Sequence, residues 1–226
     1  MPGLVIPMEL TLQEFDQIQN EYYALKDPFP KKAKPEVISY EKLIDLANEY
    51  RKPQTKLLFV WLYLTGQRIT EALELRRSNL TLATIKLKEF IAVDSISEKN
   101  RNRPRREILI PRFGYEKRMV DWVWKEIEPL EPIAKLFTYT RQMAFNYLGK
   151  VQFTTQFMDL RTKTRFTGSK GVNPHYLRHC RATHLREKYY YDTLQLLTFF
   201  GWVNANMASV YVRPTRETLA GGFIHD

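Results

Sequence analysis

The chain has 226 residues, 35 of them Lys or Arg and 25 Asp or Glu, which gives a formal net charge of +10 at pH 7. This length supports one substantial hydrophobic core, and the positive charge favours an anionic partner such as nucleic acid. The sequence has no apolar run near the roughly 20 residues that a membrane span requires, and no signal-peptide pattern. Its single cysteine, Cys180, excludes an intrachain disulfide and a thiolate metal cluster, so we expect a soluble protein of a reducing compartment.

Residues 1–35 are predicted to form an arm or linker, because three prolines interrupt any helix near their end. The main domain is expected over residues 36–211, followed by a tail over residues 212–226. Apolar spacing predicts helices at about 39–47, 54–64, 68–76, 115–128, 142–157, 174–188, 192–200 and 205–211. The pattern changes to that of short strands at 85–87, 90–96 and 107–110. The predicted fold class is therefore α+β, mostly helical, with one small three-stranded antiparallel sheet.

The first candidate site residue is Arg68, in the segment Thr65-Gly-Gln-Arg-Ile-Thr-Glu-Ala-Leu73. Arginine suits phosphate binding because its planar guanidinium binds two oxygens at once and stays protonated near neutral pH. Glu71 follows three residues later. The pair also fits an ordinary ion pair at the start of a helix, so both interpretations stay open at this point.

A second candidate lies in Asn173-Pro-His-Tyr-Leu-Arg-His-Cys-Arg-Ala-Thr-His-Leu185. Asn173 and Pro174 are typical of a helix start, which places His175 in the first turn and Arg178 one turn later on the same face. A helix N-terminus attracts anions, so both side chains would face a phosphate lying there. The alternatives are a surface histidine or a metal pair with His179, although the segment contains no acidic residue.

A third candidate segment contains Trp202 and Tyr211. The Trp202 indole can donate a hydrogen bond but cannot exchange a proton, and its other interpretation is a core aromatic. Tyr211 is one of 13 tyrosines. Because a free tyrosine has a pKa near 10, it needs nearby positive charge and donors before it can attack a phosphate.

Basic residues are concentrated in two stretches around these candidates. Residues 99–106 contain five basic residues and no acid, and residues 161–188 contain eight basic residues and one acid. A single charged run is usually a solvated surface. Two runs around one candidate site favour a groove for a phosphate backbone. The residues predicted to bind DNA in this way are Arg101, Arg103, Arg105, Arg106, Lys163, Arg165 and Lys170.

These segments, in this order, resemble the tyrosine recombinases. The first resembles that family's Thr-Gly-x-Arg-x-x-Glu box and the second its His-x-x-Arg box. Phe200-Gly-Trp-Val203, followed by Val210-Tyr-Val212, is similar to its C-terminal Gly-His/Trp and nucleophile box. The resemblance covers about residues 36–215 and implies the catalytic domain of a recombinase or integrase.

The resemblance also implies roles for the residues. Arg68, His175 and Arg178 would contact the scissile phosphate, with Glu71 orienting Arg68. Trp202 would stabilise charge, and Tyr211 would be the nucleophile. Lys99, the only lysine between Phe90 and Pro111, would protonate the leaving 5′ oxygen or else bind the DNA backbone. His179 and His184 match positions that the family uses for packing.

The implied function is site-specific cleavage and rejoining of double-stranded DNA through a 3′-phosphotyrosine link, without a metal, nucleotide or other cofactor. The implied partners are DNA and further copies of the chain, assembled as a homotetramer, in the cytoplasm of a prokaryotic cell or of the host of a virus or plasmid. Two alternatives remain: DNA relaxation like that of type IB topoisomerases, and a non-catalytic DNA-binding regulator.

Overall fold

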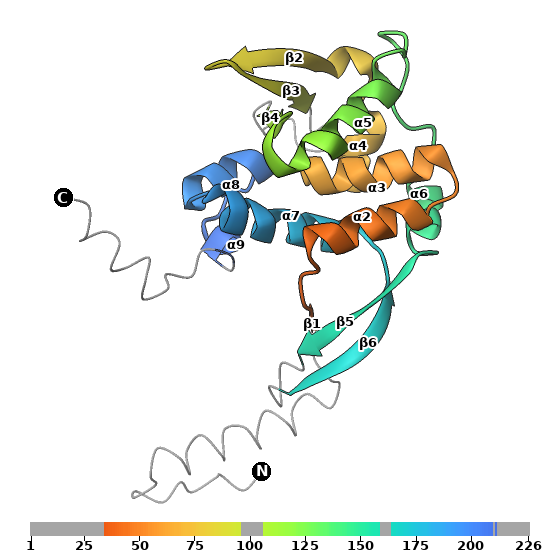
Figure 1. Cartoon of the computed structure of the whole chain (residues 1–226), viewed down its shortest axis with the longest axis vertical. Helices are drawn as coiled ribbons and strands as arrows, with labels where there is room; N and C mark the ends of the chain where they lie inside the picture. Colours follow the sequence, from red (N-terminus) through yellow and green to blue (C-terminus); the bar gives the residue numbers. More distant parts are fainter. Residues whose placement is uncertain (1–33, 96–105, 159–163, 210, 212–226) are drawn as a thin grey trace, which may run out of the picture. The chain divides into compact units, whose positions relative to one another are not determined.

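The computed structural model describes residues 34–95, 106–158, 164–209 and 211. By their contacts, these residues divide into two units (Figure 1). The smaller unit contains the described residues of 1–36 and 155–168, and the larger unit those of 37–154 and 169–226. The predicted arm and tail lie almost wholly outside the described residues, so their boundaries stay predictions.

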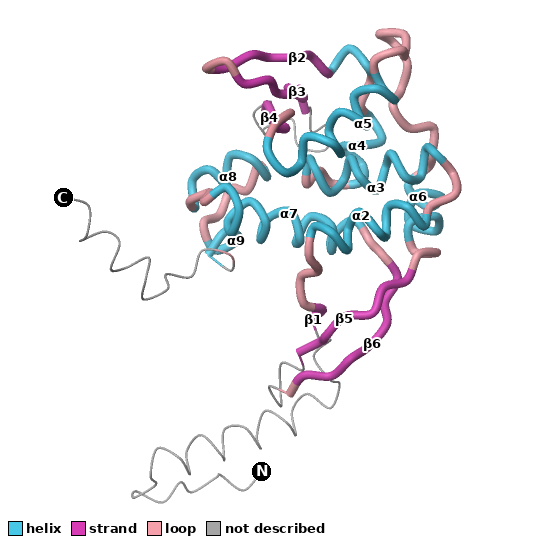
Figure 2. Tube along the Cα trace, viewed as in Figure 1, coloured by secondary structure: helices cyan, strands magenta, loops and turns pink. Residues whose placement is uncertain are grey.

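The larger unit is mostly helical, and its helices follow the predicted order (Figure 2). They are α2 (Tyr40–Glu49), α3 (Pro53–Thr65), α4 (Ile69–Glu74), α5 (Lys117–Ile127), α6 (Arg141–Leu148), α7 (Pro174–Tyr189), α8 (Thr193–Phe200) and α9 (Asn206–Ser209). Side-chain caps begin four of the predicted helices, at Ser39, Thr140, Asn173 and Asp192. Among the described helices, none is long and apolar enough to cross a membrane.

Helix α3 lies at the centre of the larger unit. It is apolar all round, and every residue from Leu57 to Thr65 is buried. Gly66 ends it in the left-handed conformation, with φ 57°, which L side chains rarely adopt. A helix that is apolar on every side must be covered by neighbours, and α3 packs against α2, α5, α6 and α7. Helix α3 therefore fixes the position of α7 and of the segment after Gly66, which both carry predicted site residues.

The predicted three-stranded sheet is present in the larger unit, with antiparallel strands β2 (Leu80–Ile85), β3 (Lys88–Ser95) and β4 (Arg106–Pro111). The prediction of the first strand at residues 85–87 was wrong. Lys86 and Leu87 have φ values of 49° and 63° and form the turn of the hairpin, so the strand precedes them. Ser95 pairs with Arg106, which brings together the two ends of the basic segment 96–105.

The predicted helix at 142–157 was also wrong in its second half. Helix α6 ends at Leu148, and β5 (Gln152–Met158) follows. Burial alternates from Val151 to Thr154, which is the period of a strand, and β5 contains the β-branched pair Thr154 and Thr155. Strand β5 belongs to a second sheet, in the order β1 (Lys34–Pro35), β5, β6 (Arg165–Gly171), which the sequence analysis did not predict.

The core of the larger unit also contains a buried ion pair. Arg181 of α7 donates from Nη1 to Oε1 of Glu116, and both side chains are 0% exposed. The Tyr63 hydroxyl lies 3.5 Å from the same carboxylate oxygen and 2.9 Å from Nδ1 of His184. Burial opposes the charge of Arg181, but Glu116 outweighs it, so the pKa of Arg181 lies above its ordinary value. This pair ties α7 to the segment that precedes α5.

Candidate active site

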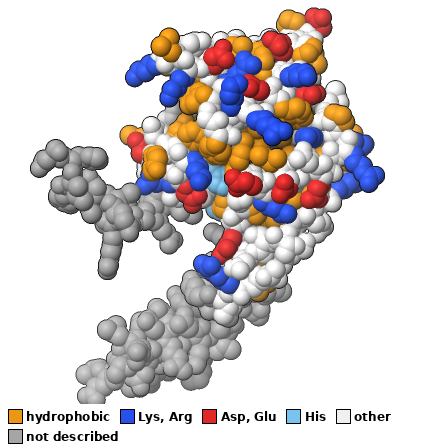
Figure 3. All heavy atoms as spheres, viewed as in Figure 1, with side chains coloured by type: hydrophobic (Ala, Val, Ile, Leu, Met, Phe, Trp, Pro, Cys, Tyr) orange, Lys and Arg blue, Asp and Glu red, His pale blue; other side chains and the backbone are white. Residues whose placement is uncertain are grey.

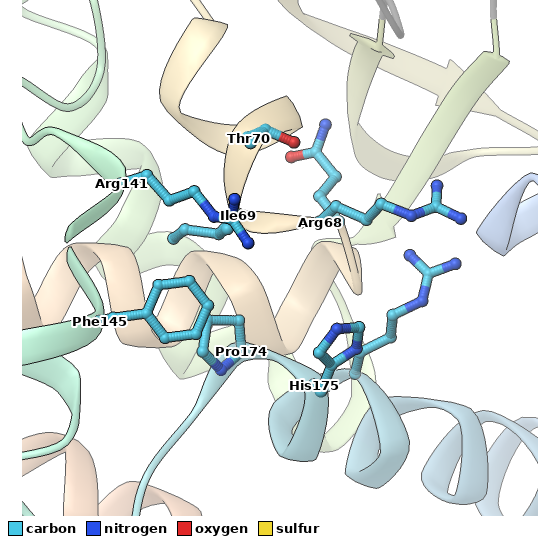
Figure 4. A pocket seen from close by; sticks show the side chains of 9 residues that line it. Arg68, Ile69, Thr70, Arg141, Phe145, Pro174 and His175 are labelled. Carbon is cyan, nitrogen blue, oxygen red and sulfur yellow. The ribbon is translucent and has the colours of Figure 1, made fainter. Parts of the chain in front are cut away.

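A pocket of about 250 Å³ opens where the start of α4, the start of α7 and helix α6 meet (Figure 4). It is lined by Gln67, Arg68, Ile69, Thr70, Arg141, Phe145, Pro174, His175 and Arg178. Figure 4 shows that Arg68, His175 and Arg141 reach it from three different elements. Three of the predicted site residues, Arg68, His175 and Arg178, therefore come together although more than a hundred residues separate the first from the other two.

Arg68 precedes α4, and Glu71 in the first turn of that helix holds it in place. The Glu71 carboxylate accepts hydrogen bonds from the Arg68 backbone N–H at 3.1 Å and from its Nη1 at 2.9 Å. Its second partner is Arg106 at the start of β4, whose Nη2 lies 2.8 Å from Oε2. Burial raises the pKa of Glu71, but the charges of Arg106 and Arg68 and the hydrogen bonds from Arg68 lower it overall. Glu71 is therefore an ionised carboxylate that orients two guanidinium groups.

Arg178 is buried, with 7% of its surface exposed, and backbone carbonyls hold it. Its Nη1 donates to the carbonyl of Gly66, and its Nη2 donates to the carbonyl of Phe200 at 2.8 Å. Burial and the positive charges of Arg106 and Arg68 lower the pKa of Arg178 to about 9, so it stays protonated at pH 7. Three guanidinium groups thus meet around one carboxylate, and a bound anion would relieve their mutual repulsion.

His175 lies where the helix start predicts, in the first turn of α7. The side chain of Asn173 caps this helix by accepting the Tyr176 N–H at 2.9 Å, and Pro174 occupies the first helical position. His175 is exposed and lines the pocket beside Arg68 and Arg178. It is therefore positioned to donate a hydrogen bond to an anion bound there.

Trp202 and Tyr211 form an aromatic stack next to Arg178. The Trp202 ring stacks on Phe200 with centroids 4.5 Å apart and on Tyr211 with centroids 5.6 Å apart. The Arg178 guanidinium lies over the Trp202 ring, 5.5 Å from its centroid. Trp202 is 9% exposed, so it is the core aromatic of the alternative interpretation, and it also contacts Arg178 and Tyr211. Through this stack the Tyr211 ring is placed beside the arginine cluster.

Gly201 lets Arg106 approach the end of α8. A Cβ built at Gly201 would lie 2.7 Å from Nη1 of Arg106, and the glycine has a φ of 60°. A larger residue would require the Arg106 side chain to shift. Arg106, which the sequence analysis assigned only to DNA binding, is therefore part of the arginine cluster.

Two residues of the site, Arg141 and His179, were not predicted from the sequence. Arg141, the first residue of α6, lines the pocket, and the Thr140 cap before it was the available signal. His179, expected only to pack, has its Nδ1 3.0 Å from the Tyr211 hydroxyl. Its i,i+4 spacing from His175 placed both histidines on one face. His184 does pack in the core, against Tyr63.

The remaining predicted residues lie elsewhere or outside the described residues. Lys99, Arg101, Arg103, Arg105 and Lys163 belong to the segments that the structure does not describe. Lys170 is half-buried on β6. Arg165, in the smaller unit, is exposed and pairs with Glu36 at 3.1 Å. Within the described ranges, no three His, Cys, Asp or Glu side chains group together as metal ligands would.

A second hollow, of about 400 Å³, is lined by residues of α2, α3 and α5 and by Tyr115. Its lining is largely apolar, with Lys56 and Arg118 as the only charged members. The face drawn in Figure 3 carries a hydrophobic patch among interspersed positive and negative side chains. Neither this hollow nor that face gathers positive side chains as the pocket with Arg68, Arg141 and Arg178 does.

The fold matches solved structures of recombinases. XerH site-specific recombinase bound to difH substrate aligns with a TM-score of 0.54 and 17% identity, over 96% of this chain and 67% of that one. XerA recombinase aligns with a TM-score of 0.54 and 15% identity, over 96% and 84% of the two chains. The Tn1549 transposon integrase in complex with circular intermediate DNA gives 0.52 and 14%, over 95% and 80%. These matches confirm the predicted fold class.

The sequence comparisons give the family. Among curated proteins, none matches the chain by sequence. The sequence model of the phage integrase family matches residues 37–218, which is most of the chain and includes every segment that carries a predicted catalytic residue. The chain therefore belongs to the phage integrase family, as its motifs predicted.

Proposed function

We propose that this protein is a site-specific DNA recombinase that cleaves and rejoins DNA through a covalent link to Tyr211. The observation that carries the proposal is the cluster of Arg68, Arg106 and Arg178 around one carboxylate, with the Tyr211 ring stacked beside it through Trp202. Such a cluster neutralises the non-bridging oxygens of a phosphodiester, and the tyrosine supplies the nucleophile.

In the proposed reaction the Tyr211 oxygen attacks the scissile phosphorus. A bond forms between the tyrosine oxygen and phosphorus, and the bond from phosphorus to the 5′ oxygen breaks. Arg68 and Arg178 hold the non-bridging oxygens, with Glu71 orienting Arg68. His175 and Trp202 donate further hydrogen bonds. Lys99, which lies outside the described residues, gives a proton to the leaving 5′ oxygen.

The covalent link explains why the proposed reaction needs neither a metal nor a nucleotide. The phosphotyrosine conserves the energy of the original phosphodiester, so the free 5′ hydroxyl of another strand can attack it and restore a DNA backbone. The arginines supply the positive charge on which phosphoryl transfer depends.

The proposed partner is double-stranded DNA. Its phosphates would contact the two basic stretches of the sequence, the first with Arg101, Arg103, Arg105 and Arg106 and the second with Lys163, Arg165 and Lys170. XerH and the Tn1549 integrase, which share the fold, were solved on DNA. Recombination of two duplexes requires four strand cleavages, so we propose a homotetramer with one active site for each. Residues 36–211 would form the catalytic domain of each protomer, with residues 1–35 as an arm and residues 212–226 as a tail.

Covalent capture tests this proposal and identifies the target sequence in the same experiment. A pool of nicked duplexes with a random central segment is incubated with the protein, denatured in detergent and sequenced from the protein-linked fraction. We expect one sequence to be enriched, and we expect Tyr211→Phe to bind that DNA with unchanged affinity while forming no adduct. Adducts of the same yield with Tyr211→Phe would refute the assignment of the nucleophile.

Two further arms separate this function from its alternatives. Adduct formation should persist in EDTA, because in the proposed reaction arginine side chains, and no metal ion, neutralise the charge on the phosphate. An enriched DNA that exchanges strands with a second copy indicates a recombinase, whereas relaxation of any supercoiled plasmid without sequence preference indicates a topoisomerase. Specific binding with no adduct at all indicates a regulator.

A further inference from the structure

The nucleophile proposed above hydrogen-bonds to a histidine that its motif did not single out. Nδ1 of His179 lies 3.0 Å from the hydroxyl of Tyr211, and the two ring centroids are 5.3 Å apart. His175 and His179 share one face of α7 at i,i+4 spacing. His175 is exposed and lines the pocket, whereas His179 is half-buried and touches the reacting oxygen.

Tyr211 requires a proton acceptor in this setting. Burial raises the pKa of its hydroxyl above the ordinary value, and the nearby charge of Arg178 offsets only part of that rise. At neutral pH the hydroxyl is therefore protonated, and its attack on phosphorus is assisted by a base within hydrogen-bond reach. The indole of Trp202, stacked on the tyrosine ring, is a donor only, and guanidinium groups are donors only.

We propose that His179 is the general base for Tyr211, an inference that rests on the proposed strand-cleavage function. As the bond from the tyrosine oxygen to phosphorus forms, the O–H bond breaks and its proton moves to Nδ1 of His179. The leaving 5′ oxygen takes its proton from a separate acid. In the rejoining step the imidazolium returns the proton to the departing tyrosine oxygen. The reaction needs His179 as the neutral tautomer that carries hydrogen on Nε2.

The charged and titratable groups around this pair come from three elements. Arg178, His175 and Cys180 lie on α7 with His179. Next to Arg178 lie Arg68 and Glu71, at the start of α4, and Arg106, at the start of β4. Arg178, Glu71 and Cys180 each keep one charge state near neutral pH. Among the described groups named here, the two imidazoles are left, so an ionisation in the rate profile can be assigned by substituting each histidine in turn.

The test uses the duplex recovered by covalent capture, with sulfur replacing the bridging 5′ oxygen at the cleaved phosphate. Sulfur departs without a proton, so the single-turnover rate reports the attack of Tyr211 alone. His179→Asn can hydrogen-bond to the hydroxyl but cannot take its proton. Against the wild type, we expect this variant to lose about 10²- to 10⁴-fold in rate at neutral pH while binding DNA equally well.

The pH profile and a rescue experiment separate a base from a packing residue. The wild-type rate should rise as imidazole loses its proton and then level off, whereas the His179→Asn rate should keep rising toward the tyrosine pKa. Added imidazole should restore the rate of His179→Ala. His175→Asn is the matched control: it should be slower than the wild type at every pH yet keep the wild-type inflection.

Three results would overturn the inference. One is a His179→Asn variant whose pH–rate profile keeps the wild-type inflection. Another is a His175→Asn variant whose profile loses that inflection, which would make His175 the base. The third is a His179→Ala variant that folds and binds DNA but does not respond to imidazole. If the wild type itself forms no adduct with any duplex of the random pool, the proposed function fails, and this role of His179 fails with it.

Discussion

Arg178 and Arg181 lie one turn apart on α7 and are both buried, yet the charges around their guanidinium groups differ. Arg181 is paired with Glu116, and its pKa is raised because that carboxylate outweighs burial. Arg178 donates to two backbone carbonyls, and burial together with Arg106 and Arg68 lowers its pKa to about 9. Arg181 is neutralised by a carboxylate of the same chain, so its role is to stabilise the fold. Arg178 lies among other positive charges, so it is suited to binding an external anion.

The largest expected effect comes from removing the partner of Arg181. Glu116→Ala leaves Arg181 buried without its counterion, and removing one partner of a buried pair costs about 3–5 kcal/mol. We expect the free energy of unfolding, measured by urea denaturation, to fall by that amount while the adduct rate per folded molecule is unchanged. The control is the double variant Glu116→Gln, Arg181→Met, which should recover most of the loss. A double variant as unstable as Glu116→Ala would mean that the pair itself is not the source.

The second largest effect is expected from substituting Arg178. Arg178→Ala removes a donor aimed at the non-bridging oxygens, and loss of such a donor lowers rates by about 10²- to 10³-fold. The adduct rate on the captured duplex should fall by this factor. The free energy of unfolding should fall by less than in Glu116→Ala, because the Gly66 and Phe200 carbonyls lose a donor but no buried charge is left unpaired. A loss of stability as large as that of Glu116→Ala would contradict the division between the two arginines.

The sequence predicted this division only in part. It placed Arg178 one turn after His175 on the same helix face, because Asn173 and Pro174 mark the helix start and a helix has 3.6 residues per turn. It left Arg181 unassigned, because its partner Glu116 lies 65 residues away and only tertiary packing brings them together. The same limit applies to Arg106, whose contact with Glu71 depends on the pairing of β3 with β4.

The errors in the fold have local physical causes. The sequence pattern predicts helix beyond Leu148 because Val151, Phe153 and Phe157 are apolar, and short apolar runs fit both periods. It predicts strand at Lys86-Leu87 because neither residue is a usual turn former, although both adopt positive φ. The helices with a clear cap and an apolar face, such as α2 and α8, were predicted within a few residues of their bounds.

A third, smaller effect tests whether the cluster depends on its one carboxylate. Glu71→Gln keeps the side-chain volume but removes the charge that orients Arg68 and Arg106. We expect the adduct rate to fall roughly 10- to 100-fold, because misplacement of a positioned group costs about that much. The effect should also appear in the wild type at acid pH: the folded pKa of Glu71 is depressed, so its contribution is present above the unfolded value and is lost as pH falls through the folded one. A Glu71→Gln variant with the wild-type rate would show that the arginines are held by the backbone alone.

The smallest effect concerns Arg141, which shares the pocket with Arg68 and Arg178 but not their burial. Arg141 is exposed, and its guanidinium lies 5.6 Å from the centroid of the Phe145 ring. A flexible, solvated cation at the rim of a phosphate site adds salt-sensitive affinity and little to the chemical step. We therefore expect Arg141→Ala to flatten the slope of log affinity against log salt by about 0.9 on duplex DNA, with an adduct rate at saturating DNA within about twofold of the wild type.

The matched control for Arg141 is Lys125→Ala, which removes one exposed positive charge from α5, a helix that does not line the pocket. If both variants change the salt slope equally, the effect belongs to net charge and Arg141 makes no particular contact. If Arg141→Ala instead lowers the saturated rate as far as Arg178→Ala does, then exposure does not separate binding from catalysis in this pocket. Equal slopes for Lys125→Ala and the wild type, with a flatter one for Arg141→Ala, would place a DNA phosphate at the start of α6.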